Sequence, residues 1–360
     1  MENPGSLVIT GIKGTSLSAE EKELIKEEKL GGVILFAHNF ETPAQLAELV
    51  NSIQSLRDEW PLFISVDHEG GRVIRFKKGF TQFPPMYEIA RMDSPKLTYE
   101  VHAIMAKELS ACGINLSFSP VCDIWTNPEN KVVGDRSFGH DIESVEKHVS
   151  AAIRGLQTNG VLACAKHFPG HGNTLKDSHY DLPLIKESLE ELKAREIQPF
   201  IRASKSRVEF MMMAHLLIDA IDPKNPTTVS AKAYQLLRDE TKFTKIVVTD
   251  DMEMKAIADR HSIEEAAFLA IDAGADMVLY RFPEDAAKAV ASLRDALKTK
   301  KLKKEKFLDK LARVEACKKE HFKEYKPIYV PKITSAFNTQ DAKKVLDIYQ
   351  AFLQGKPVPT

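Results

Sequence analysis

The chain has 360 residues, 43% of them hydrophobic, so it is long enough to bury one large core or two ordinary ones. Its 50 basic and 51 acidic residues nearly cancel, which argues against a nucleic-acid-binding protein, since that class concentrates positive charge. No stretch approaches the ~20 apolar residues of a membrane span, and no apolar run follows the first residues, so neither membrane insertion nor secretion is expected. The four cysteines form no CxxC pair and are too few for a disulfide scaffold, which favours a cytoplasmic protein.

Short apolar runs alternate with amphipathic stretches along the whole chain. The apolar runs predict strands at residues 7–10, 32–36, 62–66, 115–118, 161–165, 209–213, 246–249 and 277–279. Helical patterns lie near residues 18–28, 43–58, 95–111, 141–158, 187–203, 230–239, 262–273 and 283–298, and Ser18 with Glu21 predicts a capping box for the first helix. Continuous Val, Ile and Leu strands separated by helices indicate a parallel sheet covered on both faces.

The number of these units predicts the fold class, an α/β protein built as a (β/α)8 TIM-like barrel. An open doubly wound sheet would need a glycine-rich phosphate loop after the first strand, and the run Gly11–Gly14 is a poor match. We expect a single catalytic barrel over residues 1–325 and a helical C-terminal extension over residues 326–360, with one helix at 340–353. The extension is expected to pack on the barrel or to mediate self-association, and the sequence leaves the oligomeric state open. The lysine-rich segment 298–326 is predicted to be a solvated helix face.

Several polar motifs follow the predicted strands, at the barrel end where chemistry gathers in this fold. After the fifth strand, the run Lys166–Gly172 is followed by Asp177 and His179. The spacing of Asp177 and His179 suits a carboxylate that orients an imidazole and raises its pKa, leaving a proton available near neutral pH. Gly170 and Gly172 are expected to let this loop close over a ligand.

Zinc is a second interpretation of the same loop, because His167, His171 and His179 are numerous enough to be ligands. The proline and glycine between His167 and His171 forbid the helical i,i+4 spacing of a zinc peptidase, and no HExxH motif accompanies them. The loop therefore favours acid/base chemistry without a metal.

Two adjacent carboxylates, Asp250 and Asp251, end the seventh predicted strand. Neighbouring side chains on a strand point to opposite faces, so only one of the two is expected at the barrel mouth, as a nucleophile, a general base or a metal ligand. The other is expected to cap the helix that follows.

Two further turns carry charged groups suited to sugar hydroxyls, since carboxylates and guanidinium forks each make two directed hydrogen bonds. The run Asp67–Arg75 follows the third strand, and the glycine-bounded turn Gly134–Gly139 contains Arg136. Structural ion pairs explain either run equally well when each is taken alone.

Together, Asp67–Arg75, Gly134–Gly139, Lys166–Gly172 with Asp177-Ser178-His179, and Thr249–Met252 resemble the β-N-acetylhexosaminidases of glycoside hydrolase family 3, in particular the single-domain bacterial enzymes of cell-wall recycling. The resemblance extends from Leu7 to about Leu311. It implies a retaining enzyme that hydrolyses terminal β-linked N-acetylglucosamine (GlcNAc) from peptidoglycan-derived saccharides, without metal or organic cofactor and without a nucleic-acid or membrane partner. It further implies Asp250 as nucleophile, His179 as acid/base with Asp177 as its partner, and sugar-binding roles for Asp67, Arg75, Arg136, Lys166 and His167.

Other functions stay open at this point. A β-glucosidase or a GlcNAc phosphorylase of the same family would use the same nucleophile, although larger β-glucosidases usually take a carboxylate acid/base from a second domain. A non-catalytic sugar-binding barrel would be expected to have lost one of Asp177, His179 and Asp250. The run Tyr280–Pro283 departs from the family pattern and lies near the expected mouth.

Overall fold

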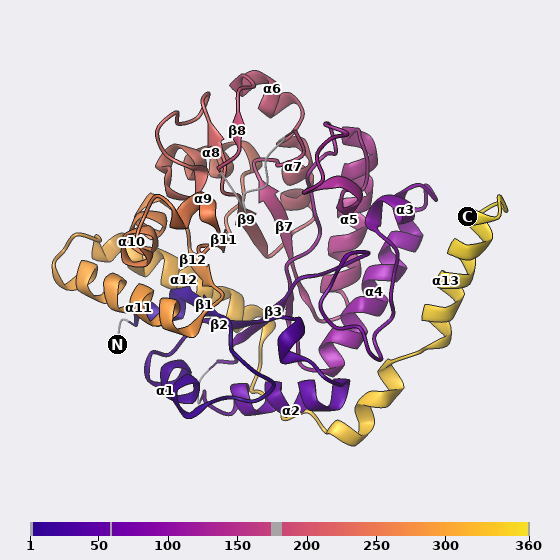
Figure 1. Cartoon of the computed structure of the whole chain (residues 1–360), viewed down its shortest axis with the longest axis horizontal. Coiled ribbons are helices and arrows are strands. Elements are labelled where there is room, and N and C mark those ends of the chain that lie inside the picture. The colour runs from indigo at the N-terminus through magenta and orange to yellow at the C-terminus, as the bar shows by residue number, and fades with distance from the viewer. Residues whose placement is uncertain (1–2, 58–59, 174–181, 359–360) are drawn as a thin grey trace.

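The computed structural model describes residues 3–57, 60–173 and 182–358. Its centre is a closed barrel of parallel strands in the order β1-β12-β11-β9-β7-β6-β3-β2 (Figure 1). The barrel strands are β1 (Val8–Thr10), β2 (Gly32–Leu35), β3 (Phe63–Val66), β6 (Leu116–Ser117), β7 (Leu162–Phe168), β9 (Phe210–Met213), β11 (Ile246–Asp251) and β12 (Met277–Tyr280). Each corresponds to one predicted strand, so the expected barrel fold is confirmed.

The barrel interior is filled by side chains from strands that are not neighbours. Phe63 at the start of β3 and Phe210 at the start of β9 meet edge to face with ring centroids 5.1 Å apart, although β6 and β7 lie between their strands. Both rings are fully buried. The barrel is therefore a packed core, and ligands have access only at its ends.

An outer layer of helices covers the barrel, as Figure 1 shows. The helices between barrel strands are α1 (Ala19–Glu27), α2 (Pro43–Gln54), α3 (Met86–Ala90), α4 (Pro95–Ala111), α5 (Ile142–Gln157), α6 (Leu189–Ala194), α7 (Gln198–Lys205), α8 (Ala231–Thr241), α9 (Lys255–Ala258) and α10 (Ile263–Ala273), and α11 (Pro283–Lys298) follows the last strand. The capping box of α1 forms as predicted, with Ser18 Oγ 3.1 Å from the Glu21 amide and Glu21 Oε2 2.8 Å from the Ser18 amide.

Two predicted boundaries were wrong. The single helix expected at 187–203 is split into α6 and α7, because Arg195 leaves the helical conformation and Pro199 can only be accommodated in the first turn of a new helix. The strand expected to end at Ala165 continues as β7 to Phe168, so Lys166 and His167 belong to the strand and not to the loop.

Helix α12 (Lys304–His321) lies across the N-terminal ends of the barrel strands. Lys318 donates a hydrogen bond of 2.9 Å to the carbonyl of Gly31, just before β2, and Arg313 pairs at 2.8 Å with Asp276, just before β12. Lys310 and Lys318 are buried, so the prediction of a solvated lysine face was wrong for these two residues. The helix closes the base of the barrel, which leaves the opposite end as the open mouth.

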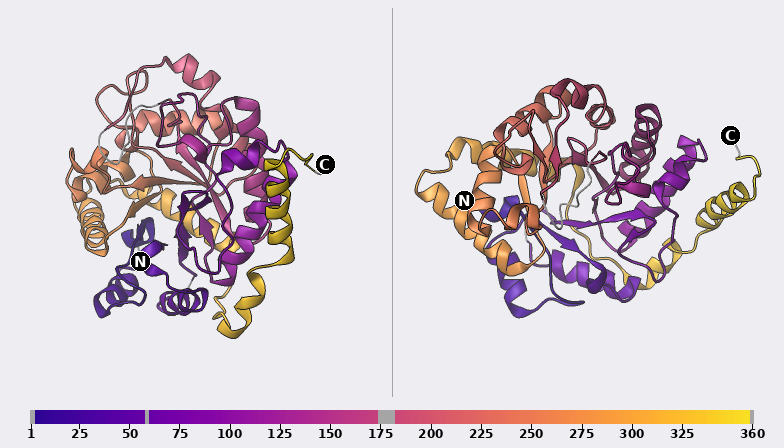
Figure 2. Two further views of the ribbon diagram at one scale, coloured as in Figure 1. Left: turned by 45° about the vertical axis from the view of Figure 1, so that its right-hand side comes forward. Right: turned by 45° about the horizontal axis from the view of Figure 1, so that its top comes forward.

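The C-terminal segment runs along the outside of the barrel (Figures 1 and 2). It contains a 3-10 helix, Val330–Ala336, and α13 (Gln340–Leu353), which lies beside α4. Ala342 and Val345 of α13 are buried, and the Arg91 guanidinium lies over the Phe352 ring, 5.7 Å from its centroid. The segment therefore contacts the outer helix layer and not the barrel interior.

Four short strands lie outside the barrel: β4 (His68–Gly70) pairs antiparallel with β5 (Val73–Ile74), and β8 (Leu184–Ile185) pairs with β10 (Leu217–Ile218). All four cysteines are unpaired and buried. Within the described ranges, none of the helices combines the length and the apolar character that a bilayer crossing requires.

Candidate active site

The barrel mouth holds a cavity of about 360 Å³, within the size range of small-molecule sites. Its walls come from the C-terminal ends of several strands, as expected for catalysis in this fold. The lining is strongly polar, and it consists of Asp67, Glu69, Arg72, Val73, Arg75, Lys131, Val132, Val133, Arg136, Lys166, His167, His171, Asp250 and Met254.

Lys166 bridges two carboxylates in this cavity. Its Nζ atom lies 2.8 Å from Asp67 Oδ1 and 2.6 Å from Glu69 Oε1, and its side chain is almost fully buried. Burial opposes its positive charge, but Asp67 and Glu69 outweigh that effect and raise the pKa of Lys166 above its ordinary value. Lys166 therefore stays charged and fixes both carboxylates.

Two arginines complete the charge network around these carboxylates. Arg75 Nη2 donates to Asp67 Oδ2 at 3.2 Å, and Arg136 forms a fork on Glu69, with Nε and Nη2 each 2.8 Å from a carboxylate oxygen. Burial disfavours the charge on Asp67, but Lys166 and Arg75 overcome it and hold its pKa below the ordinary value. The result is a rigid, ionised set of donors and acceptors.

His167 is held by a buried aspartate on the loop after β6. Asp123 Oδ2 lies 2.7 Å from His167 Nδ1, and Asp123 Oδ1 accepts a hydrogen bond of 2.6 Å from the amide of His171. This arrangement fixes the orientation of the His167 ring and leaves Nε2 as its second polar atom. Burial lowers the pKa of His171 to about 4 despite the opposing effect of Asp123.

The two carboxylates at the end of β11 have different surroundings. Asp250 lines the cavity, and its Oδ1 accepts a hydrogen bond of 2.8 Å from the Asp251 amide. Burial opposes its ionisation, but His167, His215, that amide and Lys166 together hold the pKa of Asp250 below the ordinary value. Asp250 is therefore an ionised carboxylate at the mouth.

Asp251 instead organises the polypeptide that follows. Its Oδ1 accepts from the Glu253 amide at 3.0 Å, and its Oδ2 pairs with the guanidinium of Arg281. Glu253 in turn accepts from the amides of Arg281 and Phe282. The unusual run Tyr280–Pro283 is thus attached to Asp251 and Glu253.

The residues predicted from sequence are only partly within the described structure. Asp67, Arg75, Arg136, Lys166, His167 and Asp250 all line the one cavity. Asp177 and His179 lie outside the described residues.

Gly170 and Gly172, which precede Asp177 and His179, are both required by the local backbone. Gly170 has a φ of +132°, and a Cβ added at Gly172 would lie 1.5 Å from the Ile124 carbonyl oxygen. Glycine is needed at position 170 for the positive φ and at position 172 for the close packing. That Gly170 and Gly172 let the loop close over a ligand stays a prediction.

Glu69 and Asp123 follow the third and fourth predicted strands, but no role in this site was predicted for either. Glu69 lies two residues after Asp67, and alternate residues of an extended chain share a face, so that spacing was an available signal. Asp123 contacts His167 across 44 positions of sequence, and no local pattern reports such a pairing.

Possible metal ligands at the mouth are engaged with one another. Asp123 Oδ2 bonds the His167 imidazole and Oδ1 accepts from the backbone amide of His171, and the two imidazole rings lie 6.2 Å apart between centroids. Among the described residues, three ligand atoms from His, Cys, Asp or Glu come within 4.8 Å of one another only at Glu209, Cys317 and His321, at the base of the barrel.

The barrel mouth thus presents an ionised carboxylate, the group that retaining glycosidases use as nucleophile, in a small polar cavity. Comparison with known proteins gives the same class. The model of the glycosyl hydrolase family 3 N-terminal domain matches residues 5–317.

Curated relatives and solved structures narrow the assignment. The chain is 38% identical to a β-hexosaminidase of Alkalilimnicola ehrlichii, over 79% of this chain and 82% of that protein. It is also similar to the crystal structure of NagZ from Neisseria gonorrhoeae in complex with N-trifluoroacetyl-D-glucosamine, with a TM-score of 0.78, 32% identity and 97% coverage of each chain. A family 3 β-N-acetylglucosaminidase from Paenibacillus sp. str. FPU-7 gives a TM-score of 0.89 at 34% identity, covering 97% of this chain and 67% of that one. The chain therefore belongs to glycosyl hydrolase family 3, within its β-hexosaminidases.

Proposed function

We propose that this protein is a retaining exo-β-N-acetylglucosaminidase that releases terminal β-linked GlcNAc from peptidoglycan-derived saccharides. The observation that carries the proposal is the position of Asp250, an ionised carboxylate in the same cavity as the Lys166, Asp67 and Glu69 cluster. GlcNAc is supported by the relatives, one a β-N-acetylglucosaminidase and another bound to a substituted glucosamine.

In the first step, a carboxylate oxygen of Asp250 attacks the anomeric carbon, and the bond from that carbon to the leaving oxygen breaks. His179 supplies the proton that the leaving oxygen takes up, and Asp177 supports the positive charge on the imidazole before transfer. The product of this step is a glycosyl ester on Asp250 and a free aglycone alcohol.

In the second step, the now neutral His179 takes a proton from water as the water oxygen attacks the anomeric carbon. The ester bond to Asp250 breaks, the carboxylate is restored, and GlcNAc leaves with the same anomeric configuration as the substrate. A histidine suits both roles because its ordinary pKa of ~6.5 lies near neutral pH.

The remaining cavity residues bind the sugar. Asp67 and Glu69 accept hydrogen bonds from hydroxyls, while Lys166, Arg75 and Arg136 hold those carboxylates in place. Arg75 Nε is a buried donor without a hydrogen-bond partner among the described residues, so it is available to a hydroxyl or to the N-acetyl carbonyl. Because α12 closes the barrel base, the sugar enters from the mouth, which fits exo-cleavage of a terminal residue.

The cationic rim of the cavity suits an acidic aglycone, such as the muramic acid portion of a muropeptide. Arg72 and Lys131 line the cavity, and about half of the Arg72 side chain is exposed. Four unpaired, buried cysteines suit a reducing compartment, so we place the reaction in the cytoplasm.

The proposal is tested by turnover of nitrophenyl β-GlcNAc beside the β-glucoside and β-GalNAc analogues. We expect preference for β-GlcNAc, release of the β-anomer first, and a peptide adduct at Asp250 when a fluorinated GlcNAc derivative slows the second step. An adduct on another residue would disprove the assigned nucleophile, and GlcNAc-1-phosphate formed in phosphate buffer would identify a phosphorylase.

A further inference from the structure

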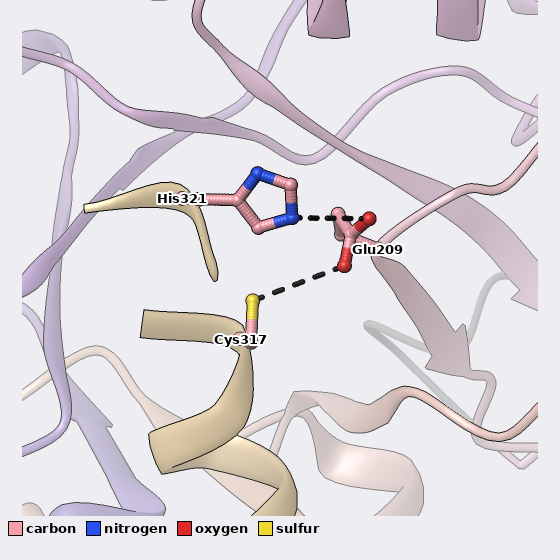
Figure 3. A group of neighbouring side chains, drawn as sticks. All are labelled: Glu209, Cys317 and His321. Carbon is pink, nitrogen blue, oxygen red and sulfur yellow. Dashed lines mark hydrogen bonds and ion pairs between the residues drawn. The ribbon is translucent and has the colours of Figure 1, made fainter. Parts of the chain in front are cut away.

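We propose that Glu209, Cys317 and His321 form a zinc-binding site at the base of the barrel, at the end opposite the active site. Glu209 immediately precedes β9, and Cys317 and His321 lie one helical turn apart near the end of α12. Figure 3 shows their polar atoms directed toward one another. The proposal is independent of the sugar-cleaving function.

The separations between the ligand atoms fit a tetrahedral zinc centre. His321 Nε2 lies 3.2 Å from Glu209 Oε1, Cys317 Sγ lies 4.0 Å from Glu209 Oε2, and all three ligands lie within 4.8 Å of one another. With Zn–S bonds of ~2.3 Å and Zn–N or Zn–O bonds of ~2.0 Å, tetrahedral ligand atoms lie roughly 3.3–3.6 Å apart. Shifts of roughly 0.5–1.3 Å in these side chains bring the ligand atoms to those separations.

The carboxylate already has a partner that orients it. Lys245 Nζ contacts Glu209 Oε1, the oxygen that His321 Nε2 also contacts, which leaves Oε2, 4.0 Å from Cys317 Sγ, to bind the metal. Metal-binding side chains are commonly held by such outer hydrogen bonds. The positive charge of Lys245 also offsets part of the negative charge that a carboxylate and a thiolate bring to the site.

One side of the proposed zinc site is buried and the other side is open to solvent. The Glu209 side chain is 3% exposed and Cys317 is buried, whereas the His321 side chain is 26% exposed. Solvent can therefore supply a fourth ligand from the His321 side, and Glu320 Oε1 lies 4.0 Å from His321 Nε2 as another donor. The mixture of one sulfur, one nitrogen and one oxygen favours Zn²⁺ over Mg²⁺ or Ca²⁺, which prefer oxygen ligands.

A metal here would join two parts of the chain that are distant in sequence. Glu209 and Cys317 are separated by 108 positions, and the bond network would hold α12 against the strand ends at the barrel base. A ligand that binds only the folded state stabilises it. Zinc at this site would therefore raise thermal stability and leave the sugar-cleaving chemistry unchanged.

The test begins with the full-length protein stripped of metal by a chelator and then desalted. We expect isothermal titration with Zn²⁺ to give one tight equivalent that requires Cys317, a rise in melting temperature, and, with Co²⁺, the near-ultraviolet absorption of a sulfur–cobalt bond. Cys317→Ser should weaken binding at least about 100-fold, because even the loss of an outer partner of a metal ligand typically costs roughly 10- to 100-fold.

Two further variants make the result decisive. Cys112→Ser removes another buried thiol and should retain both the zinc affinity and the cobalt–sulfur absorption. His321→Gln changes a partly exposed side chain and should lose affinity even if Cys317→Ser folds poorly. Absence of tight binding, or binding that survives both Cys317→Ser and His321→Gln, would overturn the proposal; the second result would place zinc elsewhere, for example at the mouth histidines.

Discussion

The guanidinium of Arg136 donates two hydrogen bonds of 2.8 Å to the two carboxylate oxygens of Glu69, and both side chains are largely buried. The fork fixes the position of Glu69, and Lys166 Nζ is 2.6 Å from the same carboxylate. Lysine cannot reproduce a planar two-point contact, so replacing Arg136 with lysine tests whether the position of Glu69 matters for sugar binding.

Arg136→Lys is predicted to lower kcat/KM on a β-GlcNAc substrate by about 10- to 100-fold, because one of two charge-assisted bonds is lost and Glu69 can rotate. Steady-state kinetics check this, with the melting temperature measured in parallel. Arg154→Lys, an exposed change on α5, should leave both quantities unchanged. Unaltered kinetics for Arg136→Lys would mean that the fork serves folding alone.

Asp250→Asn is predicted to reduce kcat by roughly 10⁴-fold or more, as the loss of a covalent nucleophile does in other enzymes. The folded state should survive, because a buried negative charge is replaced by a neutral group of the same shape. The neighbouring change Asp251→Asn is the matched control. It disturbs the contacts to Arg281 and Glu253 and should cost far less activity, and equal losses for the two variants would contradict the assignment of Asp250.

His179→Ala is predicted to slow glycosylation and deglycosylation by about 10²- to 10⁴-fold, the usual contribution of a general acid/base. The loss should be smaller for a nitrophenyl leaving group, which needs little protonation. Asp177→Ala should move the alkaline limb of the kcat profile to lower pH, because removing a negative charge beside an imidazole lowers its pKa. A full pH–rate profile of each variant checks both points, and an unmoved limb in Asp177→Ala would show that the two residues are not coupled.

Local sequence signals were sufficient for the barrel itself. Each strand is a short apolar run, and the capping box of α1 depends only on Ser18 and Glu21. Because Lys166 and His167 are polar, the search for apolar runs predicted the end of β7 too early. These residues stay in the strand because β7 pairs with β9 up to Phe168, and Val121 forms a bridge to Lys166.

Long-range pairings were the part that no local pattern could report. Asp67 and Asp250 were identified because each follows an apolar run directly. Asp123 is linked to His167, and Glu209 to Cys317 and His321, only after the barrel has closed. Two interacting residues can be recognised from the sequence when both lie on the same helix, strand or loop. When they lie on different elements, only the tertiary structure shows that they interact.

The buried His68 side chain is expected to make the free energy of unfolding depend on pH. Neither ring nitrogen has a hydrogen-bond partner among the described residues, and the ring lies 5.6 Å from Phe80. Burial, with a further effect of Arg75, lowers the pKa of His68 from 6.5 to about 4. Between these values the unfolded chain binds the proton and the folded chain does not, so stability is lost as pH falls from 6.5 toward 4.

His68→Leu is therefore predicted to make the loss of stability in acid shallower by up to about 1.4 kcal/mol per pH unit, or on the order of 3 kcal/mol over the whole interval. His102 and His148, whose pKa values burial also lowers to about 4, would still contribute to the remaining slope. Urea unfolding of both proteins between about pH 7 and about pH 4.5 measures the difference. Parallel curves would show that His68 is not buried in the neutral form.

Removal of residues 338–360 tests the proposal that the C-terminal extension is a separate element outside a complete catalytic barrel. Helix α13 buries Ala342 and Val345 beside α4, and no residue of α13 lines the mouth cavity. Burial of one Val-sized side chain contributes roughly 1.5–3 kcal/mol, so the truncated protein should lose on the order of 2–4 kcal/mol of unfolding free energy. Its kcat and KM should match those of the full chain.

Val345→Ala is the matched control for this truncation, because it weakens the same contact without removing the helix. Light scattering of both proteins separates the two roles expected for the extension. A truncated protein with the same number of subunits and full activity would fit a helix that packs only on its own barrel. A fall in mass to a smaller assembly would show that α13 mediates self-association. A large fall in kcat would contradict its placement outside the catalytic unit, since none of the described residues that line the cavity belongs to α13.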